Sequence, residues 1–216
     1  KSLERYGRWP WSRTRQAKLI ERIINGRPTV LAIDIFYPER ESKKADAALS
    51  KTLKKGKGRI VLAAGFDTAP EPAGEVPDYL LDNAITNIKG QSRLKDVVSV
   101  TKRKTSIAPL SSQAMLGHVF SPADLDGKLR WEVLAVKYQD ELYPSLSLMT
   151  AALARRKELN DITLYGGRGV ALGNEYIPTD GSGRMRVDFL GPERTFHYVS
   201  AADVLSGEFK TSGFRD

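Results

Sequence analysis

Two apolar runs, each preceded by an amphipathic helix, constrain the fold of this chain more than any other feature. Residues 29–36 (TVLAIDIF) are rich in β-branched side chains, and residues 60–64 (IVLAA) are entirely apolar. A nearly continuous apolar run is typical of a parallel strand covered on both faces, so we expect residues 29–36 to form a central strand. Residues 12–25 and 42–54 place their apolar side chains at helical spacing. This helix–strand–helix–strand order predicts an α/β fold.

The stretch before the first helix, residues 7–13 (GRWPWSR), reads as a rigid entry into that helix. Pro10 fixes its own φ and favours an extended Trp9. Ser12 is placed to cap the helix, and Gly26 is placed to end it in a left-handed conformation. From chemistry alone, the two indoles either plug the fold as structural residues or belong to a site that is partly buried and partly solvated.

The rest of the chain predicts a mixed, mainly parallel sheet with flanking helices and antiparallel hairpin additions in the C-terminal third. Residues 66–106 are expected to be an irregular excursion, with a short helix at 79–89 and a polar hairpin or mobile segment at 91–106. The other expected elements are a helical turn at 111–116, a strand at 128–138, a helix at 145–157, short strands at 162–165, 170–172, 176–177, 184–189 and 195–199, and a helix that Ser200 caps, ending before Gly207.

Composition limits the classes of function. The chain has no cysteine, which excludes thiolate nucleophiles, disulfides and cysteine-based zinc sites. It has no run of 18 apolar residues and no signal peptide, and it begins at Lys1 rather than methionine, so we expect a fragment of a longer protein. The net charge of +8 favours acidic partners.

Motifs for catalysis or metal binding are weak. Residues 124–127 (DLDG) resemble the start of a calcium loop but lack the later oxygen ligands, so a plain turn is expected. Residues 166–169 (GGRG) lack the lysine of a phosphate loop and predict a hairpin turn. His118 and His197 have neither metal-ligand nor triad spacing. We therefore expect no catalytic residues, no metal site and no cofactor.

Three basic clusters are more typical of a solvated face than of a nucleic-acid groove, because they lack interleaved aromatic residues. They lie at residues 54–59, 102–104 and 155–157. The first and third flank helix ends, where cations complement the helix dipole. Nucleic acid is therefore not the expected partner.

Taken together, the motifs resemble the second type of CHASE sensor family. The similarity covers nearly the whole chain in order, interrupted mainly at 66–106, through GRWPW, VLAIDIFYPE, DAALSKTL, RIVLAAG, LGHV, DLDG, RWEVL, YPSLSLMTAAL, YIP, VDFLGP, TF and SAADVLSG. The resemblance implies a single extracytoplasmic input domain over residues 1–216, belonging to a bacterial membrane-anchored receptor. The implied output is an adenylate or guanylate cyclase, with a histidine kinase as the alternative.

Family members usually carry one strand before the segment matching residues 1–3 and another after the segment matching 214–216. The resemblance therefore implies truncation at both ends of this chain. Sheet edges exposed in this way pair readily with another chain, so we expect a homodimer.

Three functions remain open from the sequence: a sensor of a small molecule or protein signal, a hydrolase or transferase on an α/β scaffold, and a basic module that binds anionic surfaces. Asp34, Asp46 and His118 are the few groups that an enzyme would have available. For a sensor, arginines would clamp an anionic group and indoles would cover an apolar or cationic part. Packing or surface ion pairing is the alternative role for each candidate contact: Arg8, Trp9, Trp11, Arg13, Asp34, Asp46, Arg130 and Ser145.

Overall fold

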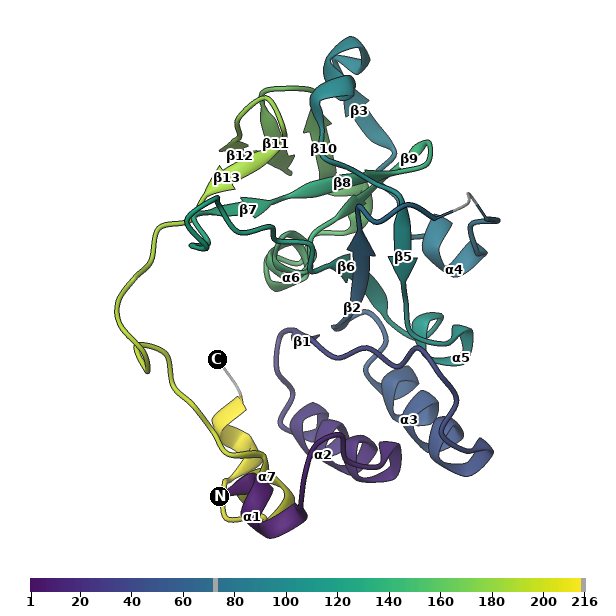
Figure 1. The fold of residues 1–216 in the computed structure, drawn as a ribbon. Coiled ribbons are helices and arrows are strands. Elements are labelled where there is room, and N and C mark those ends of the chain that lie inside the picture. Colours follow the sequence, from purple (N-terminus) through teal and green to yellow (C-terminus); the bar gives the residue numbers. More distant parts are fainter. Residues whose placement is uncertain (72–73, 215–216) are drawn as a thin grey trace.

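The α/β class and the mixed sheets are confirmed by the computed structural model, which describes residues 1–71 and 74–214 (Figure 1). Residues 72–73, inside the expected excursion, and 215–216, in the closing segment of the resemblance, lie outside the described residues. Within these described residues, the strands form four small sheets rather than one continuous sheet.

The strand β2 (Ile60–Asp67), not β1 (Leu31–Ile33), is central. It pairs in parallel with β1 on one side and with β6 (Met115–His118) on the other, and its end pairs antiparallel with β5 (Lys102–Lys104). The prediction that residues 29–36 form a central strand is therefore wrong. The ladder of β1 is three residues long and Ala32 is exposed, whereas the first five residues of β2 are at most 1% exposed.

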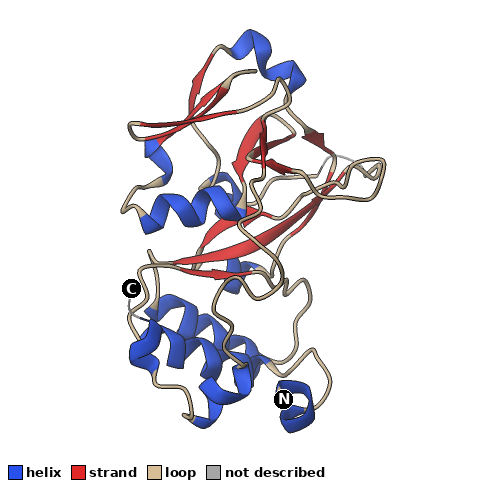
Figure 2. Cartoon of the chain, turned by 90° about the vertical axis from the view of Figure 1, so that its left-hand side faces the viewer, coloured by secondary structure: helices blue, strands red, loops and turns tan. Residues whose placement is uncertain are grey.

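Helices cover both faces of this sheet (Figure 2). On one face, α2 (Arg13–Asn25) and α3 (Lys43–Lys55) pack side by side over a core that includes Leu49 and Leu62. On the other face, α6 (Leu146–Ala154) packs on β6 and β2. Gly117 permits this approach, because a Cβ there would lie 2.5 Å from the Cα of Leu146.

The helix caps predicted from the sequence are present in the structure, with one exception. The hydroxyls of Ser12, Ser42 and Ser145 accept backbone N–H groups of α2, α3 and α6. Gly26 is right-handed, at φ −70°, and Arg27 takes the left-handed conformation at φ 60°. The expected role of Gly26 is therefore wrong. The N–H of Arg27 still bonds to the carbonyl of Ile24, so the chain reverses one residue later.

The segment 66–106 contributes strands to three of the four sheets instead of forming an irregular excursion. Its strands β3, β4 and β5 pair with β10, β8 and β2. The helix expected over 79–89 is shorter because residues 87–89 form a strand. The elements are α4 (Asp78–Leu81), β3 (Asn87–Lys89), η1 (Gln91–Asp96), β4 (Ser99–Val100) and β5.

Downstream, the antiparallel additions expected in the C-terminal third are present as the meander β10–β11–β12. The strand expected over 128–138 is two strands in different sheets. The helical turn expected at 111–116 is also wrong at its end, because residues 115–116 belong to β6 (Met115–His118). The elements are α5 (Ala108–Ser111), β7 (Trp131–Val133), β8 (Ala135–Tyr138), β9 (Glu141–Pro144), η2 (Leu159–Asp161), β10 (Ile162–Tyr165), β11 (Gly169–Leu172), β12 (Glu175–Pro178), β13 (Arg184–Arg186), α7 (Ala201–Ser206) and η3 (Thr211–Phe214).

Residues 187–199, which we call the strap, run from β13 to α7 and bow outward (Figure 1). The prediction of a strand at residues 195–199 is wrong, because the strap pairs with no strand within residues 1–71 and 74–214. Four large apolar side chains of the strap are 66–73% exposed: Phe189, Leu190, Phe196 and Tyr198.

The helix α1 (Ser2–Tyr6) lies against α7, so the two ends of the described chain meet (Figure 1). Lys1 and Arg5 pair with Glu208 at 3.3 and 2.8 Å. The hydroxyls of Ser2 and Ser200 are 2.7 Å apart. We call this set of contacts the terminal clasp.

Candidate functional site

A groove of about 570 Å³ lies between the start of α2 and the chain that follows β1. We call it the tryptophan groove. Its walls are residues 9–13 with Gln16 on one side and residues 35–41 on the other. The carboxyl end of a strand in an open α/β sheet is a common place for ligands. The sequence motif GRWPW and the strand end that follows it in the chain therefore meet in one place.

The two indoles of the groove differ in exposure. Trp11 is 7% exposed, and its Nε1 donates to the carbonyl of Gly7 at 3.0 Å. Trp9 is 47% exposed and meets Trp11 edge to face, with ring centroids 5.5 Å apart. Trp11 is thus a structural plug, while the ring of Trp9 forms a half-exposed wall of the groove.

Arg13 and Asp46 form a buried ion pair beneath the groove. The guanidinium donates to Asp46 at 2.5 Å and also to the carbonyl of Glu39. Although burial disfavours the charged carboxylate, hydrogen bonds from Arg13 and from the backbone of Glu41 keep the pKa of Asp46 below its usual value. Arg13 is therefore engaged within the protein.

The N-terminus of α2 is already occupied by an acidic side chain. The Glu41 carboxylate accepts the backbone N–H of Arg13 at 2.9 Å, and Ser12 accepts the N–H of Arg15. A helix N-terminus attracts anions, but here the protein supplies its own. The arginine clamp stays a prediction, and at the start of α2 the Glu41 carboxylate already occupies the place that an anion would take.

A buried polar network that the sequence analysis missed supports the floor of the groove. The Tyr37 hydroxyl donates to the Gln16 side chain at 2.6 Å, and Gln16 donates to the carbonyl of Trp11 at 2.6 Å. Burial raises the pKa of Tyr37 above its ordinary value. The signal available in the sequence was Gln16, a polar residue beside Ala17 and four positions before Ile20 on the apolar helix face.

Two further candidates lie at a second groove, on the opposite face of the sheet. We call it the strand-end groove; it has a volume of about 1000 Å³ and is lined by Asp34, Ala32 and the outer side of α6. Ser145 is completely buried behind it and caps α6, accepting the N–H of Leu148 at 3.1 Å. Ser145 is thus a structural residue.

The remaining candidates, Arg8 and Arg130, do not join these sites. Arg130 is held by the turn that resembled a calcium loop, with contacts of 2.8 Å to Asp124 and 2.6 Å to Asp126. Arg8 is exposed beside Trp9. Of the eight candidates, the structure brings together Trp9, Trp11, Arg13 and, beneath them, Asp46.

A sequence model described as the CHASE2 domain matches residues 1–216, the whole chain. The chain belongs to the CHASE2 family. CHASE2 domains are extracellular sensory domains of signalling receptors and are not catalytic. No curated protein and no solved structure matches the chain.

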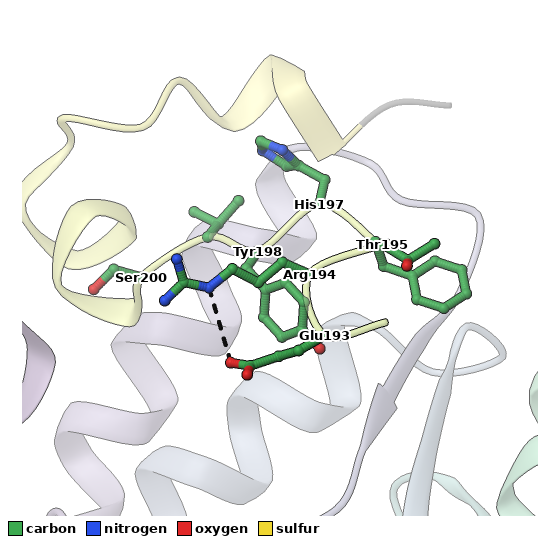
Figure 3. Close-up of a pocket in the computed structure, with 8 residues that line it drawn as sticks. Glu193, Arg194, Thr195, His197, Tyr198 and Ser200 are labelled. Carbon is green, nitrogen blue, oxygen red and sulfur yellow. Dashed lines mark ion pairs between the residues drawn. The ribbon is translucent and has the colours of Figure 1, made fainter. Parts of the chain in front are cut away.

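This CHASE2 domain has a third hollow, formed by residues 193–200 alone, which are the end of the strap and Ser200 (Figure 3). In the close-up, Arg194 points toward Glu193, and their charged atoms are 3.9 Å apart. Because one stretch of chain makes every wall, this hollow is a bend of the strap and not a site assembled by the fold.

Within residues 1–71 and 74–214 of this CHASE2 domain, no three His, Asp or Glu side chains gather where they would hold a metal ion. In the same described residues, no helix combines the length and the apolar character needed to cross a bilayer.

Proposed function

We propose that this CHASE2 domain senses a small molecule in the tryptophan groove, as the extracytoplasmic input domain of a bacterial membrane-anchored receptor. Its output is an adenylate or guanylate cyclase, with a histidine kinase as the second candidate. The receptor acts as a homodimer, and nucleic acid is not its partner. The observation that carries the proposal is Trp9, a half-exposed aromatic wall above a buried polar network.

The chemistry of the groove favours a ligand with a flat apolar or cationic part. Trp9 presents its ring, and aromatic faces attract cations. With Asp46 included, carboxylates outnumber guanidinium groups three to two around the groove: Glu39, Glu41 and Asp46 against Arg13 and Arg40. An anionic ligand would have to displace Glu41 from the start of α2. A planar amine is therefore the favoured ligand class.

The groove is connected to both ends of the described chain through α1. Trp11 contacts the ring of Tyr6 at 5.6 Å between centroids, and Arg15 donates to the carbonyl of Tyr6 at 3.1 Å. The terminal clasp then joins α1 to α7. A ligand that binds one position of Trp9 and Trp11 more tightly would shift the position of α1, and this supports a route by which binding becomes a signal.

Tryptophan fluorescence tests the proposed site directly. The chain has three tryptophans, so in a Trp131→Phe background the signal comes from Trp9 and Trp11 alone. Planar amines and anionic metabolites are screened for a change in fluorescence and in melting temperature, at low and high salt. We expect an amine to bind at both salt concentrations, and Trp9→Ala to abolish binding while the melting temperature is retained.

Tyr176→Ala is the matched control, because Tyr176 is 52% exposed on a different sheet. Equal binding by the Trp9→Ala and Tyr176→Ala variants would refute the tryptophan groove as the site. Binding of a short oligonucleotide that disappears at high salt would favour a basic surface instead. The output is identified by assaying the complete receptor for cyclic nucleotide formation and for autophosphorylation.

A further inference from the structure

The positive charge of this domain is concentrated in its N-terminal part. Residues 1–59 contain 16 lysines and arginines against six aspartates and glutamates, whereas residues 60–216 contain 18 against 20. The net charge of +8 therefore comes from the segment that forms α1, α2, β1 and α3, and the rest of the chain is slightly acidic. A charge excess of this kind indicates an acidic partner, and the structure shows which surface carries it.

The helices α2 and α3 carry nine basic side chains and two acidic ones. Both acids are paired, Asp46 with Arg13 in the buried ion pair and Glu21 with Lys55 at the surface. Lys55, and more weakly Lys51, hold the pKa of Glu21 below its usual value. The outer side of the two helices therefore keeps a net positive charge. We call it the basic helix face, and its residues are Lys18, Arg22, Lys44, Lys51, Lys54 and Lys55.

The cations of this face form two adjacent rows. Lys18 and Arg22 are four residues apart on α2, and on α3 a row at intervals of seven and four begins at Lys44. Side chains at these spacings lie on one side of a helix. Glu21 lines a hollow of about 630 Å³ together with Lys18 and Arg22. The same glutamate pairs with Lys55 of α3, so the two rows form one continuous surface.

The stability of the two helices does not account for these charges. Lys51 and Lys55 are a like-charged pair four residues apart, as are Lys18 and Arg22, and such pairs destabilise a helix. Lys44 lies in the first turn of α3, where the helix dipole disfavours a cation. The dipole explains only the cations of the last turns. A charge pattern that costs its own helices stability indicates a negatively charged partner outside the domain.

The chemistry of the face favours a layer of anionic headgroups over a nucleic acid. Neither helix has an aromatic side chain on which a base could stack. Five of the six cations are lysines, which act as point charges, whereas arginine is the residue that binds a single phosphate with two hydrogen bonds. Lysine-rich surfaces are typical of binding to the diffuse negative potential of a membrane.

The position of the face also favours a membrane. The helix α2 contacts α7 and η3, and α7 contacts α1, so the basic helix face lies beside both ends of the described chain (Figure 1). In the membrane-anchored receptor of the proposed function, a bilayer is therefore available as the partner.

We propose that the basic helix face binds the anionic phospholipid headgroups of the membrane that anchors the receptor. Each basic side chain near such a surface strengthens binding roughly fivefold. Because the first residues of α2 form one wall of the tryptophan groove, this attraction would also hold the groove in a fixed orientation to the bilayer. The inference rests on the membrane anchoring in the proposed function and adds the lipid surface as a partner.

Vesicle sedimentation tests the proposal. Vesicles of phosphatidylglycerol and phosphatidylcholine in equal parts are compared with vesicles of phosphatidylcholine alone. We expect the domain to bind only the mixed vesicles, with an affinity that falls as the salt concentration rises. Lys18→Gln, Lys44→Gln and Lys51→Gln together should weaken this binding at least tenfold. The three side chains are exposed, so the melting temperature of the variant should stay unchanged or rise.

The matched control removes the same charge outside the basic helix face. Lys89→Gln, Lys102→Gln and Lys128→Gln lie at exposed positions and should leave vesicle binding close to that of the wild type. Equal losses in the two triple variants would show that net charge alone acts and would overturn the inference. No preference of the wild type for the mixed vesicles would overturn it as well.

Two further measurements separate the partners and the sites. A short oligonucleotide that binds more tightly than the mixed vesicles, and that only the first triple variant fails to bind, would make the face a nucleic-acid site and overturn the membrane as its partner. Ligand binding at the tryptophan groove is followed by tryptophan fluorescence in the same variants. Lost vesicle binding with retained ligand binding would leave the proposed sensor site standing, and the reverse result would refute that site and leave the basic helix face.

Discussion

Arg13 and Asp46 lie 33 residues apart in the sequence and meet as an ion pair whose side chains are 7% and 5% exposed. The pair joins the first residue of α2 to the first turn of α3. It therefore fixes the position of the helix start that forms one wall of the tryptophan groove. Both residues were candidate ligand contacts, and the structure gives them a supporting role.

Removing one member of this pair is expected to be costly. Arg13→Met leaves the Asp46 carboxylate buried without a counter-charge, and the free energy of unfolding should fall by about 3–5 kcal/mol. Urea denaturation measures the loss. Arg8→Met, at an exposed position in the same stretch, should change stability by less than about 0.5 kcal/mol. Equal losses for the two variants would contradict a structural role for the pair.

Ser145→Ala should remove the cap of α6. The hydroxyl accepts the N–H of Leu148, and its loss is expected to lower the free energy of unfolding by about 1 kcal/mol. Chemical denaturation compares it with Ser147→Ala, an exposed neighbour that does not cap the helix. Fluorescence titration should give unchanged affinity at the tryptophan groove. Loss of binding with full stability would make Ser145 a ligand contact after all.

Gly117→Ala should force α6 away from β6. The added methyl would lie 2.5 Å from the Cα and 2.7 Å from the nitrogen of Leu146, so the helix must move. The expected loss is about 1–3 kcal/mol in thermal or urea unfolding. At Gly181 a Cβ meets nothing within 4 Å, and Gly181→Ala should be neutral. A stable Gly117→Ala variant would show that α6 does not depend on this close approach.

His118 should make the domain sensitive to acid. The side chain is 2% exposed, and burial lowers its pKa to about 3. An unfolded histidine titrates near pH 6.5, so between about pH 6.5 and pH 3 the unfolded state binds the extra proton. The free energy of unfolding should therefore fall as the pH is lowered through this window, by about 1 kcal/mol per pH unit.

Urea titrations at several pH values measure this slope, and His118→Gln should reduce it. His197→Gln, in the exposed strap, is the matched control and should leave the slope unchanged. If His118→Gln kept the wild-type slope, carboxylates rather than His118 would govern acid unfolding.

The longer helices α2, α3 and α6 were predictable because their signals are local. Ser12, Ser42 and Ser145 each precede an apolar repeat, and each caps a helix in the structure. Which strand lies at the centre of the sheet was not predictable in this way. Residues 29–36 and 60–64 are both apolar, and only pairing with distant β6 decides that β2 is central. Long-range pairing also recruits the polar segment 66–106 into sheets.

The candidate site was predicted only in part, again because contacts between distant residues cannot be read from the sequence. The aromatic and charged residues of GRWPW were recognisable, but their roles depend on the partners that the fold brings to them. Glu41 occupies the start of α2, and Asp46 engages Arg13. Arg130 was a candidate contact with surface ion pairing as its alternative role, and the structure pairs it with Asp124 and Asp126 of the DLDG turn.

The terminal clasp has a consequence for the order of folding. Arg5 and Glu208 are separated by 203 positions, so their contact closes a loop of nearly the whole chain. The entropy lost in closing a loop increases with its length, and such contacts form only after the intervening structure has shortened the path. The clasp should therefore form last and open first. Substitutions in it should accelerate unfolding and leave the rate of folding nearly unchanged.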